Sequence, residues 1–463
     1  MAGIGFRLNN MARGGGLVGI AGAAGYGALI SAGPWLLTVL ATIGLETWTK
    51  ARLAPGQQHD MLAVTVYCFC LSAVAASPVN LLSVRLVADR LFVKDQMGVP
   101  ALLLGGIAAA SLLALVLGSL VFGALCALSF IQASLAILLV IWLTQIWVIS
   151  PLLTAIEQYR IIFLAYAAGA AVAGGLLATP VERTLAAVCA GTGVTLAILL
   201  VTLRRYFCAP LGRAAVDLPG RKTFVLMIAA GFASTAAIWI DKWLLWFAPG
   251  SVAAAGSLRV NPINDHGSFL GLLTIVPGMA LILIVTETRF DHAFRRMLSA
   301  CTGTATLTAI EQARRGLAGV IFYDLRLTVI LQSLIVGLSW VFAVPLFDLL
   351  GADTRGIFAF RNTVIGVLFH LVVLQKTIYL AYYDLFGCIL LVWTSFCVTS
   401  GLMVWAQWQL GVAGFGLGYM AGAIVAAAVA LTMVSKATQD LTYLLFVGNN
   451  PSMVGSGHHR LWI

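Results

Sequence analysis

The sequence predicts an all-α polytopic membrane protein, because its composition and its repeated apolar runs both fit a chain that folds in lipid. Of the 463 residues, 61% are hydrophobic and only 10% are charged. Soluble domains carry roughly 25% charged residues, so this chain could not cover itself with a polar surface in water. A backbone inside a bilayer must satisfy its own hydrogen bonds, and the alternating pattern of a membrane strand is absent. The spans are therefore expected to be helices.

Apolar runs long enough to cross a bilayer recur along the whole chain and predict about twelve transmembrane helices. The first run follows Arg7 and Arg13 and is too long for the core of a signal peptide, so it is expected to remain as a span. The predicted spans are 17–43, 61–84, 99–125, 129–153, 161–179, 184–203, 223–247, 268–285, 323–350, 357–380, 385–406 and 411–434.

A basic stretch at 204–222, which contains Pro210, Pro219 and Gly220, divides these spans six and six. This division is the arrangement expected of a two-bundle transporter. It predicts an N-terminal six-helix bundle at 1–203, a cytoplasmic linker at 204–222, a C-terminal bundle at 223–440 and a tail at 441–463.

The loops predict the orientation of the chain, because most of their cations fall on one side of the membrane. That side includes Arg85, Arg90, Arg204, Arg221, Lys376 and Lys436. Cytoplasmic loops carry such an excess, so both termini are expected in the cytoplasm. Four tryptophans fall near predicted outward helix ends, as an interfacial belt requires: Trp48, Trp246, Trp405 and Trp408.

A second long polar interruption, 286–320, is expected to form a cytoplasmic amphipathic insert in the C-terminal bundle. Its basic content is typical of a surface helix that lies on anionic lipid heads. The sharper hypothesis is a docking site for a cytosolic partner. The candidate docking residues are Arg289, Arg295, Arg296, Arg314 and Arg315.

The clearest charges inside a span are Asp241 and Lys242, and an ionisable residue there costs roughly 2.5–3.5 kcal/mol on insertion scales. Three tryptophans share one face of this helix: Trp239, Trp243 and Trp246. If that face meets lipid, Asp241 turns inward in line with Ser234, two turns earlier, while Lys242 snorkels outward. Asp241 then either serves a transport pathway or closes the helix end through a salt bridge.

Other polar groups in spans are weaker candidates for a pathway. Tyr166 and His370 could face a sugar, although tyrosines also anchor helices at interfaces. Asp324 and Arg326 could pair within the bundle or mark a cytoplasmic helix end.

Prolines provide candidate helix breaks, which mark transport sites when they recur in both halves of a transporter. The candidates are Pro34, Pro78 and Pro277. The last two fall in the second predicted span of each half, each about two turns before its cytoplasmic end.

Motifs of common enzymes are missing, which favours a role other than catalysis. The sequence has no phosphate-binding Gly-x-x-x-x-Gly-Lys-Ser/Thr loop, no Asp-x-Asp sugar-metal motif, no Gly-x-Ser-x-Gly elbow and no His-Glu-x-x-His. The 8 cysteines lie in or beside apolar runs without a histidine cluster, so they are expected to be small core residues. The net charge of +10 follows the loops and indicates topology, not nucleic-acid binding. We therefore expect no catalytic residue, metal site or cofactor.

Several segments, scattered in order over roughly residues 1–315, resemble the PelG family of inner-membrane Pel exopolysaccharide transporters. They are MAGIGF at 1–6, YGALISAGPW at 26–35, VADRLF at 87–92, IWIDKWLLWF at 238–247, LTIVPG at 273–278, ETRFD at 287–291 and ATLTAIE at 305–311. The resemblance implies the multidrug, oligosaccharidyl-lipid and polysaccharide exporter superfamily, with two six-helix lobes around a central cavity in the bacterial inner membrane. It also implies three partners: a PelF-like cytosolic glycosyltransferase, a PelD-like cyclic-di-GMP receptor and a PelE-like membrane protein.

The leading hypothesis is therefore an inner-membrane transporter that exports an N-acetylhexosamine-rich exopolysaccharide for the biofilm matrix. One alternative is a lipid-linked oligosaccharide flippase or cation-coupled antiporter of the same superfamily. Another is a membrane scaffold that anchors the polysaccharide synthase without transporting its product.

Overall fold

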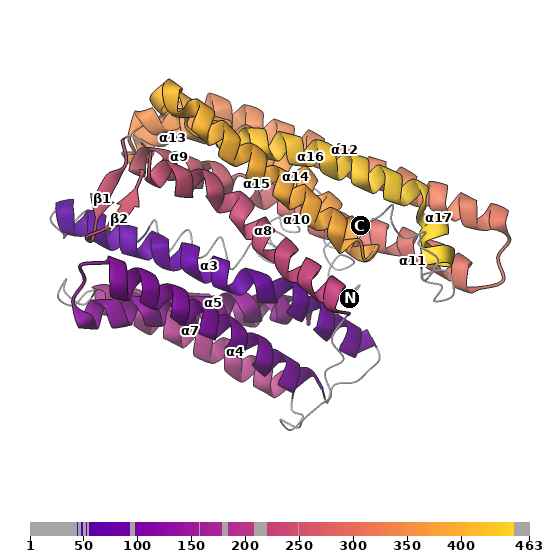
Figure 1. Ribbon diagram of the computed structural model, residues 1–463, viewed down its shortest axis with the longest axis horizontal. Helices are drawn as coiled ribbons and strands as arrows, with labels where there is room; N and C mark the ends of the chain where they lie inside the picture. Colours follow the sequence, from indigo (N-terminus) through magenta and orange to yellow (C-terminus); the bar gives the residue numbers. More distant parts are fainter. Residues whose placement is uncertain are drawn as a thin grey trace, which may run out of the picture. The chain divides into compact units, whose positions relative to one another are not determined.

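Helices account for almost all of the described chain (Figure 1). The computed structural model describes residues 55–92, 98–156, 158–177, 184–207, 220–248 and 250–448, with Gly44, Trp48, Thr49 and Arg52 before them. The predicted first span at 17–43, Pro34, most of the 204–222 linker and the end of the tail lie outside these residues.

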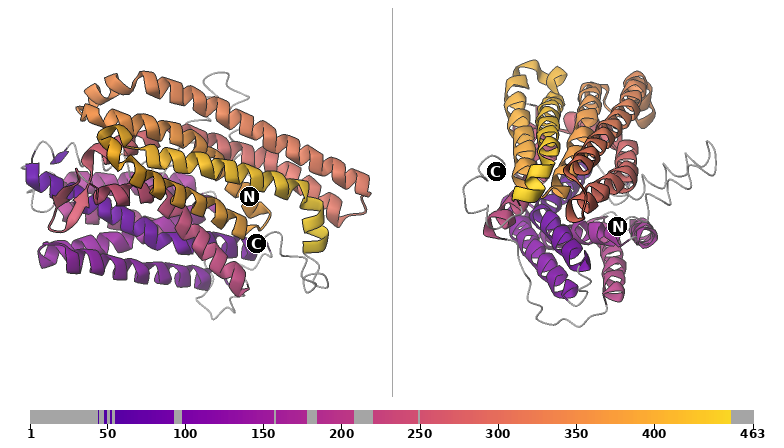
Figure 2. Two further views of the ribbon diagram at one scale, coloured as in Figure 1. Left: turned by 45° about the horizontal axis from the view of Figure 1, so that its top comes forward. Right: turned by 90° about the vertical axis from the view of Figure 1, so that its right-hand side faces the viewer.

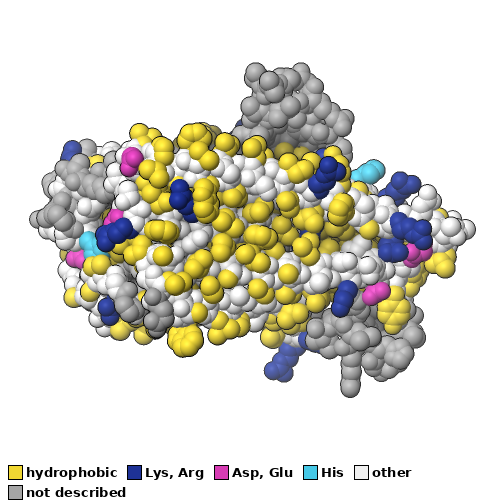
Figure 3. Space-filling model, turned by 90° about the horizontal axis from the view of Figure 1, so that it is seen from above, with side chains coloured by type: hydrophobic (Ala, Val, Ile, Leu, Met, Phe, Trp, Pro, Cys, Tyr) yellow, Lys and Arg dark blue, Asp and Glu magenta, His cyan; other side chains and the backbone are white. Residues whose placement is uncertain are grey.

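Within the described ranges, 11 helices are long and apolar enough to cross a membrane. Their surfaces fit a lipid solvent, because large hydrophobic side chains such as Leu112 and Leu349 are 63% and 83% exposed. Figure 3 shows hydrophobic side chains across the middle of one face, while lysines and arginines gather towards both ends. The predicted fold class is confirmed: the chain is an all-α, multi-pass membrane protein.

The chain divides into two compact units. The N-terminal unit holds the described residues of Gly33–Trp239 and Leu245–Pro262, and the C-terminal unit holds those of Ile240–Leu244 and Ile263–Ile463. The elements of the N-terminal unit are α3 (Pro55–Phe92), α4 (Val99–Gly118), η1 (Ser119–Leu125), α5 (Phe130–Ala155), α6 (Tyr159–Leu177), α7 (Thr184–Tyr206), most of α8 (Arg221–Trp246), β1 (Val252–Ala254) and β2 (Leu258–Val260). The two strands form an antiparallel hairpin, and the Ala255 amide beside it donates to Asp60 Oδ1 on α3 at 2.7 Å.

The C-terminal unit contains α12 (Leu307–Val341), a helix of 35 residues. Its elements are α9 (Pro262–Leu273), α10 (Val276–Val285), η3 (Thr286–Phe290), α11 (Asp291–Thr302), α12 (Leu307–Val341), α13 (Ala343–Leu350), η4 (Thr354–Gly356), α14 (Ile357–Tyr382), α15 (Phe386–Gln407), η5 (Trp408–Gly414), α16 (Leu417–Gln439), α17 (Leu441–Tyr443) and η6 (Leu444–Gly448). The turn of α8 at Ile240–Leu244 also belongs to this unit.

Local sequence explains several helix ends. The Ser129 hydroxyl accepts from the Gln132 amide, and Gln132 Oε1 accepts in return from the Ser129 amide, so a capping box begins α5. Thr306 caps α12 through a single hydrogen bond, which its hydroxyl accepts from the Ala309 amide at 3.3 Å. Pro277 stands in the first turn of α10, where its missing amide hydrogen costs no helical bond.

The predicted insert at 286–320 is built differently from a separate surface segment. Its first part is the π-helical turn η3 and helix α11, which continue from α10, and its second part is the beginning of α12. A bilayer core needs only about 20 helical residues, whereas α12 has 35. α11 packs against α12, and the pair forms one end of the C-terminal unit beside α17 (Figures 1 and 2). We call α11 and the part of α12 up to Val320 the α11–α12 hairpin.

Two sequence predictions about residues of these helices are wrong. Pro78 does not break its helix, because α3 runs through it from Pro55 to Phe92, whereas α9 ends shortly before Pro277. A proline can stay inside a transmembrane helix when neighbouring groups satisfy the freed carbonyl. Trp246 is not a lipid-facing or interfacial residue, since it is 2% exposed and stacks on Tyr67 with ring centroids 4.5 Å apart. Trp405, in contrast, is 70% exposed.

Candidate functional site

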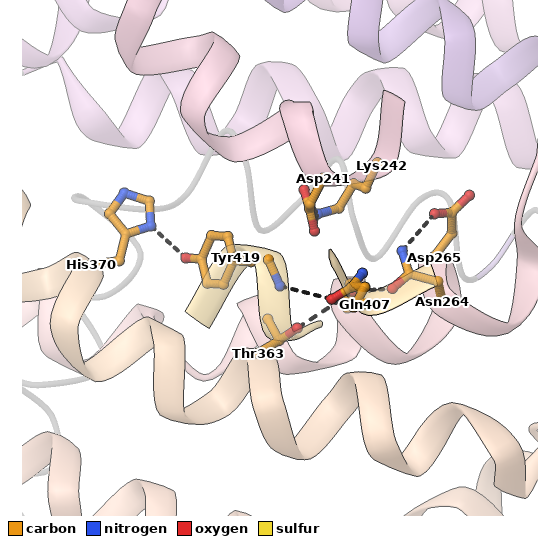
Figure 4. Close-up of polar contacts among 10 residues, drawn as sticks. Asp241, Lys242, Asn264, Asp265, Thr363, His370, Gln407 and Tyr419 are labelled. Atoms are coloured by element: carbon orange, nitrogen blue, oxygen red, sulfur yellow. Dashed lines mark hydrogen bonds and ion pairs between the residues drawn. The ribbon is translucent and has the colours of Figure 1, made fainter. Parts of the chain in front are cut away.

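A buried ion pair lies in the interior of the C-terminal unit (Figure 4). Asp241 and Lys242, consecutive on α8, are each 1% exposed, and Lys242 Nζ is 3.1 Å and 3.2 Å from the two carboxylate oxygens of Asp241. Neighbouring residues on a helix point in different directions, so the long lysine stem must fold back to reach the carboxylate. The result is a pair without net charge, which the apolar interior accepts far more readily than either charge alone.

Aromatic rings from other helices enclose the ammonium of this pair. Lys242 Nζ lies 5.7 Å from the ring centroid of Tyr419 on α16 and 5.9 Å from that of Phe269 on α9. These distances fit cation–π contacts, which replace part of the hydration that Lys242 loses. The expectation that Lys242 snorkels outward is therefore wrong: its charge is balanced inside the protein by one carboxylate and two rings.

His370 joins the same centre through Tyr419. The Tyr419 hydroxyl and His370 Nδ1 share a hydrogen bond of 2.5 Å, and both residues are buried. The edge-on rings of Trp393 and Phe396 on α15 lie 5.6 Å from the imidazole centroid. The structure thus brings two of the predicted candidates, Asp241 and His370, to opposite sides of one tyrosine, although nothing in the sequence linked either of them to Tyr419.

Further polar side chains lie along α9 near this centre, as Figure 4 shows. Asn264 Nδ2 donates to Asp265 Oδ1 at 3.3 Å, and the Ser268 hydroxyl donates to Asn264 Oδ1 at 3.4 Å. Thr363 on α14 reaches Ser268 at 3.4 Å, and Gln407 Oε1 on α15 accepts from the Gly418 amide at 3.1 Å. These groups, with the ion pair, Tyr419 and His370, form the central polar cluster.

The cluster suits a conformational or proton-linked role better than a metal site. Both oxygens of Asp241 face one ammonium, so a metal cation would have to displace Lys242. Across the described ranges, no group of three or more His, Cys, Asp or Glu residues could hold a metal ion. Hydroxyls, amides and aromatic faces dominate instead, which is the chemistry that binds sugars or holds helices in one arrangement.

Two other predicted pathway residues belong to the N-terminal unit. The Ser234 hydroxyl on α8 donates to the Gly231 carbonyl at 2.7 Å, and Tyr166 on α6 is partly buried against a hydrophobic cluster that includes Ile149 and Leu199. Such a local serine bond is a common structural feature of membrane helices. A pathway role for Ser234 and Tyr166 stays a prediction.

The five candidate docking arginines fall into two classes. Arg289, Arg295 and Arg314 form ion pairs with Asp324, Asp291 and Glu311, at 3.4, 2.8 and 2.8 Å respectively. Arg296 and Arg315 are exposed on the α11–α12 hairpin and have no ion pair among the described residues. Arg296 and Arg315 are therefore the two candidate docking charges without a carboxylate partner among the described residues.

A second cluster of buried polar residues surrounds Asp324 and Lys376, of which the sequence indicated only Asp324. Asp324 on α12 is fully buried and Lys376 on α14 is 1% exposed, so the prediction that Lys376 is a cytoplasmic loop cation is wrong. Three polar residues of α12 share one face at a spacing of four and are completely buried: Asp324, Thr328 and Gln332. That spacing in an apolar span was a readable signal of an inward polar stripe.

The fold resembles that of several solved membrane transporters. The chain is similar to a multidrug resistance MATE family transporter of the MOP superfamily in an outward-facing conformation, with a TM-score of 0.62, 13% identity, and coverage of 91% of this chain and 96% of that one. An inward-facing structure of such a transporter matches with a TM-score of 0.58, 15% identity, and coverage of 90% and 99%. A MOP superfamily transporter from Pyrococcus furiosus matches with a TM-score of 0.56, 15% identity, and coverage of 90% and 94%. The chain therefore shares its fold with these transporters.

The family follows from the sequence itself. The profile of the PelG family, described as exopolysaccharide exporters (EPS-E), matches residues 1–446, and this chain belongs to that family. No curated protein sequence matches this chain. The resemblance seen in scattered segments over roughly residues 1–315 thus extends over nearly the whole chain.

Proposed function

We propose that this chain forms the path by which a growing, N-acetylhexosamine-rich exopolysaccharide crosses the bacterial inner membrane during production of the biofilm matrix. The observation that carries the proposal is membership of the PelG exporter family over residues 1–446, on a fold shared with MOP transporters. The central polar cluster supports it, because buried aromatic and hydroxyl groups near a neutralised ion pair suit an uncharged sugar chain better than a small cation.

The chain would work with a cytosolic glycosyltransferase of the PelF kind, with a PelD-like cyclic-di-GMP receptor and a PelE-like membrane protein as further partners. The α11–α12 hairpin is the docking surface that we propose for the transferase. Arg296 and Arg315 would contribute the attraction, since the neighbouring arginines are already neutralised by carboxylates.

Gene deletion with complementation tests this function. Deletion should abolish exported polymer while the glycosyltransferase stays active in cell extracts, and the intact gene supplied in trans should restore export. Full export from the deletion strain would refute the proposal.

A cation-coupled flippase or antiporter is the second candidate, and the burial of Asp241 favours it. Because Lys242 occupies both carboxylate oxygens, coupling at Asp241 would require the pair to open during the cycle. Purified protein in vesicles separates the two functions. Uptake of a small substrate that depends on an ion gradient would favour the antiporter, and its absence alongside polymer export in cells would favour the exporter.

A further inference from the structure

Lys376 on α14 is as deeply buried as Lys242 but has a different environment. Both side chains are 1% exposed, and Lys376 Nζ donates to Gln375 Oε1 at 3.1 Å and to the Ile321 carbonyl at 3.4 Å. The ammonium also lies 4.8 Å from the ring centroid of Tyr379. No carboxylate of the described chain is within ion-pair distance of Lys376, whereas Asp241 is 3.1 Å from Lys242.

An ammonium buried in this way is unfavourable at membrane depth unless it is neutralised. Lysine can lose its proton when it is buried, which arginine cannot do. Lys376 is 1% exposed, so its apolar surroundings disfavour a permanent charge at this position.

The other charged and titratable groups around Lys376 are few. Asp324 faces it from α12, Arg289 approaches Asp324 from η3, and Tyr379 lies one turn further along its own helix. Asp324 and the Tyr379 hydroxyl are buried and interact with each other. Arg289 is 43% exposed, so this end of the cluster reaches the surface of the C-terminal unit.

A line of buried polar groups leads from Lys376 into the unit. Gln375 Nε2 donates to Thr328 Oγ1 at 3.0 Å, and Gln332, one turn further along α12, donates to the Thr274 carbonyl at 3.1 Å. Thr274 lies in the break between α9 and α10. Gln332 Oε1 is also buried without a partner. We call Gln375, Thr328, Gln332 and Thr274 the polar line.

Hydrogen bonds between membrane helices often serve only to hold the helices together. That role accounts for the contact between Gln375 and Thr328. It does not account for an ammonium that lies outside ion-pair distance of every described carboxylate, or for the unpartnered Oε1 of Gln332. Buried polar atoms of this kind are normally satisfied by water, which would complete a hydrogen-bonded route.

We propose that Lys376 is a proton-exchange site. Its amine takes up a proton from water at the end of the cluster where Arg289 is half-exposed, and it returns the proton to water during the working cycle. The polar line is the route that connects the exchanged proton at Lys376 to the interior of the unit. The proposal goes beyond polysaccharide export, because it concerns protonation of the chain whatever its cargo.

The pH dependence of unfolding tests the proposal on purified full-length protein. Unfolded Lys376 stays protonated to about pH 10.4. If the folded protein holds the neutral amine, the unfolded state binds one proton more, and stability rises with pH through the neutral-to-alkaline range. The unfolding constant of the wild type should then fall by up to about tenfold per pH unit. Lys376→Met and Lys376→Arg should both lose this component, whereas Lys242→Arg should keep it.

Equal pH slopes in the wild type and both Lys376 variants would overturn the proposal.

Polymer export gives a second readout for folded variants. The Met variant is permanently neutral and the Arg variant permanently charged, so both should export at least about tenfold less if exchange is required. Wild-type export by Lys376→Arg would show that only the charge matters and would also overturn it. If gene deletion left export intact, the proposed function would fail while the pH-slope difference would still stand.

Discussion

The guanidinium of Arg289 and the carboxylate of Asp324 are joined across the base of the α11–α12 hairpin, with Nη1 3.4 Å from Oδ1. Arg289 belongs to the π-helical turn η3, and its guanidinium also lies 4.7 Å from the ring centroid of Tyr323 on α12. π-helical turns often occur at functional sites, where they reposition a side chain. Because the Arg289 guanidinium neutralises the fully buried carboxylate of Asp324, Arg289 is unsuitable as a docking charge.

Removal of Arg289 should therefore destabilise the protein by leaving the Asp324 carboxylate uncompensated. Breaking a fully buried pair costs about 3–5 kcal/mol, and we expect roughly 1–3 kcal/mol for Arg289→Ala because the guanidinium is partly solvated. The free energy of unfolding of the purified protein measures the effect. Arg289→Ala combined with Asp324→Asn should recover part of the loss, since the uncompensated carboxylate is then removed. Wild-type stability of Arg289→Ala alone would contradict the role assigned to this pair.

Reversal of charge at Arg296 and Arg315 should weaken the docking of the cytosolic transferase. We expect Arg296→Glu/Arg315→Glu to lower co-purification of the transferase by about tenfold or more, because close like charges across an interface cost several kcal/mol. Exported polymer should fall in parallel, while the amount of protein in the membrane stays unchanged.

Arg355 offers the matched control for the docking experiment. It lies outside the hairpin, and its hydrogen bonds hold the pKa of Asp353 below the usual range of a carboxyl group. Arg355→Gln should leave both co-purification and export close to wild type, because exposed ion pairs contribute only about 0–1 kcal/mol. Undiminished co-purification with the double Glu variant would exclude these two arginines as the docking charge.

The Asp241–Lys242 pair allows structural and functional roles to be separated. Asp241→Asn or Lys242→Met alone should destabilise the protein by about 3–5 kcal/mol, because each leaves a buried charge unpaired. The double variant Asp241→Asn/Lys242→Met should be much closer to wild type in the free energy of unfolding, since it buries no charge. Unfolding of the three purified variants provides the measurement.

Export by the double variant then decides the role of the pair. If the pair only closes the helix, the stable double variant should export polymer normally. If the pair opens during the cycle, export should fall although stability is restored. Equal stability of the double variant and the worse single variant would contradict the account of the pair as a neutral buried unit.

The sequence predicted the fold well because lipid imposes a simple rule on each segment. The described spans coincide closely with the apolar runs, as at 129–153 and α5 (Phe130–Ala155), since a span must be both long and apolar. The rule fails where a helix leaves the bilayer. α12 begins at Leu307, well before the predicted span at 323–350, because a polar helix outside lipid continues the same backbone without a change in hydropathy to mark it.

The site was less predictable because its contacts join helices far apart in the chain. Asp241 and His370 are recognisable in the sequence because ionisable residues inside a span are unusual. Tyr419, which lies between them, has no such signal, since it is an ordinary residue of an apolar run. The orientation of Lys242 could not be predicted because the rings of Phe269 and Tyr419, which lie beside its ammonium, belong to other helices. For Lys376, hydropathy at a helix end indicated a loop, while packing between α12 and α14 buries it.

Close packing of α14 against α16 should make the central polar cluster sensitive to a single methyl group at Gly366. A Cβ atom there would lie 2.6 Å from Cδ1 of Tyr419 and 3.1 Å from the backbone of Met420, so α16 must move to admit it. Gly366→Ala should therefore destabilise the protein by about 1–3 kcal/mol, the usual cost of overpacking. Gly337→Ala on α12 is the control, because nothing lies within 4 Å of its added methyl group. It should be neutral or stabilising by up to about 1 kcal/mol, since alanine favours a helix. Unfolding of the two purified variants makes the comparison, and equal stabilities would mean that Tyr419 is not held in place by contact with Gly366.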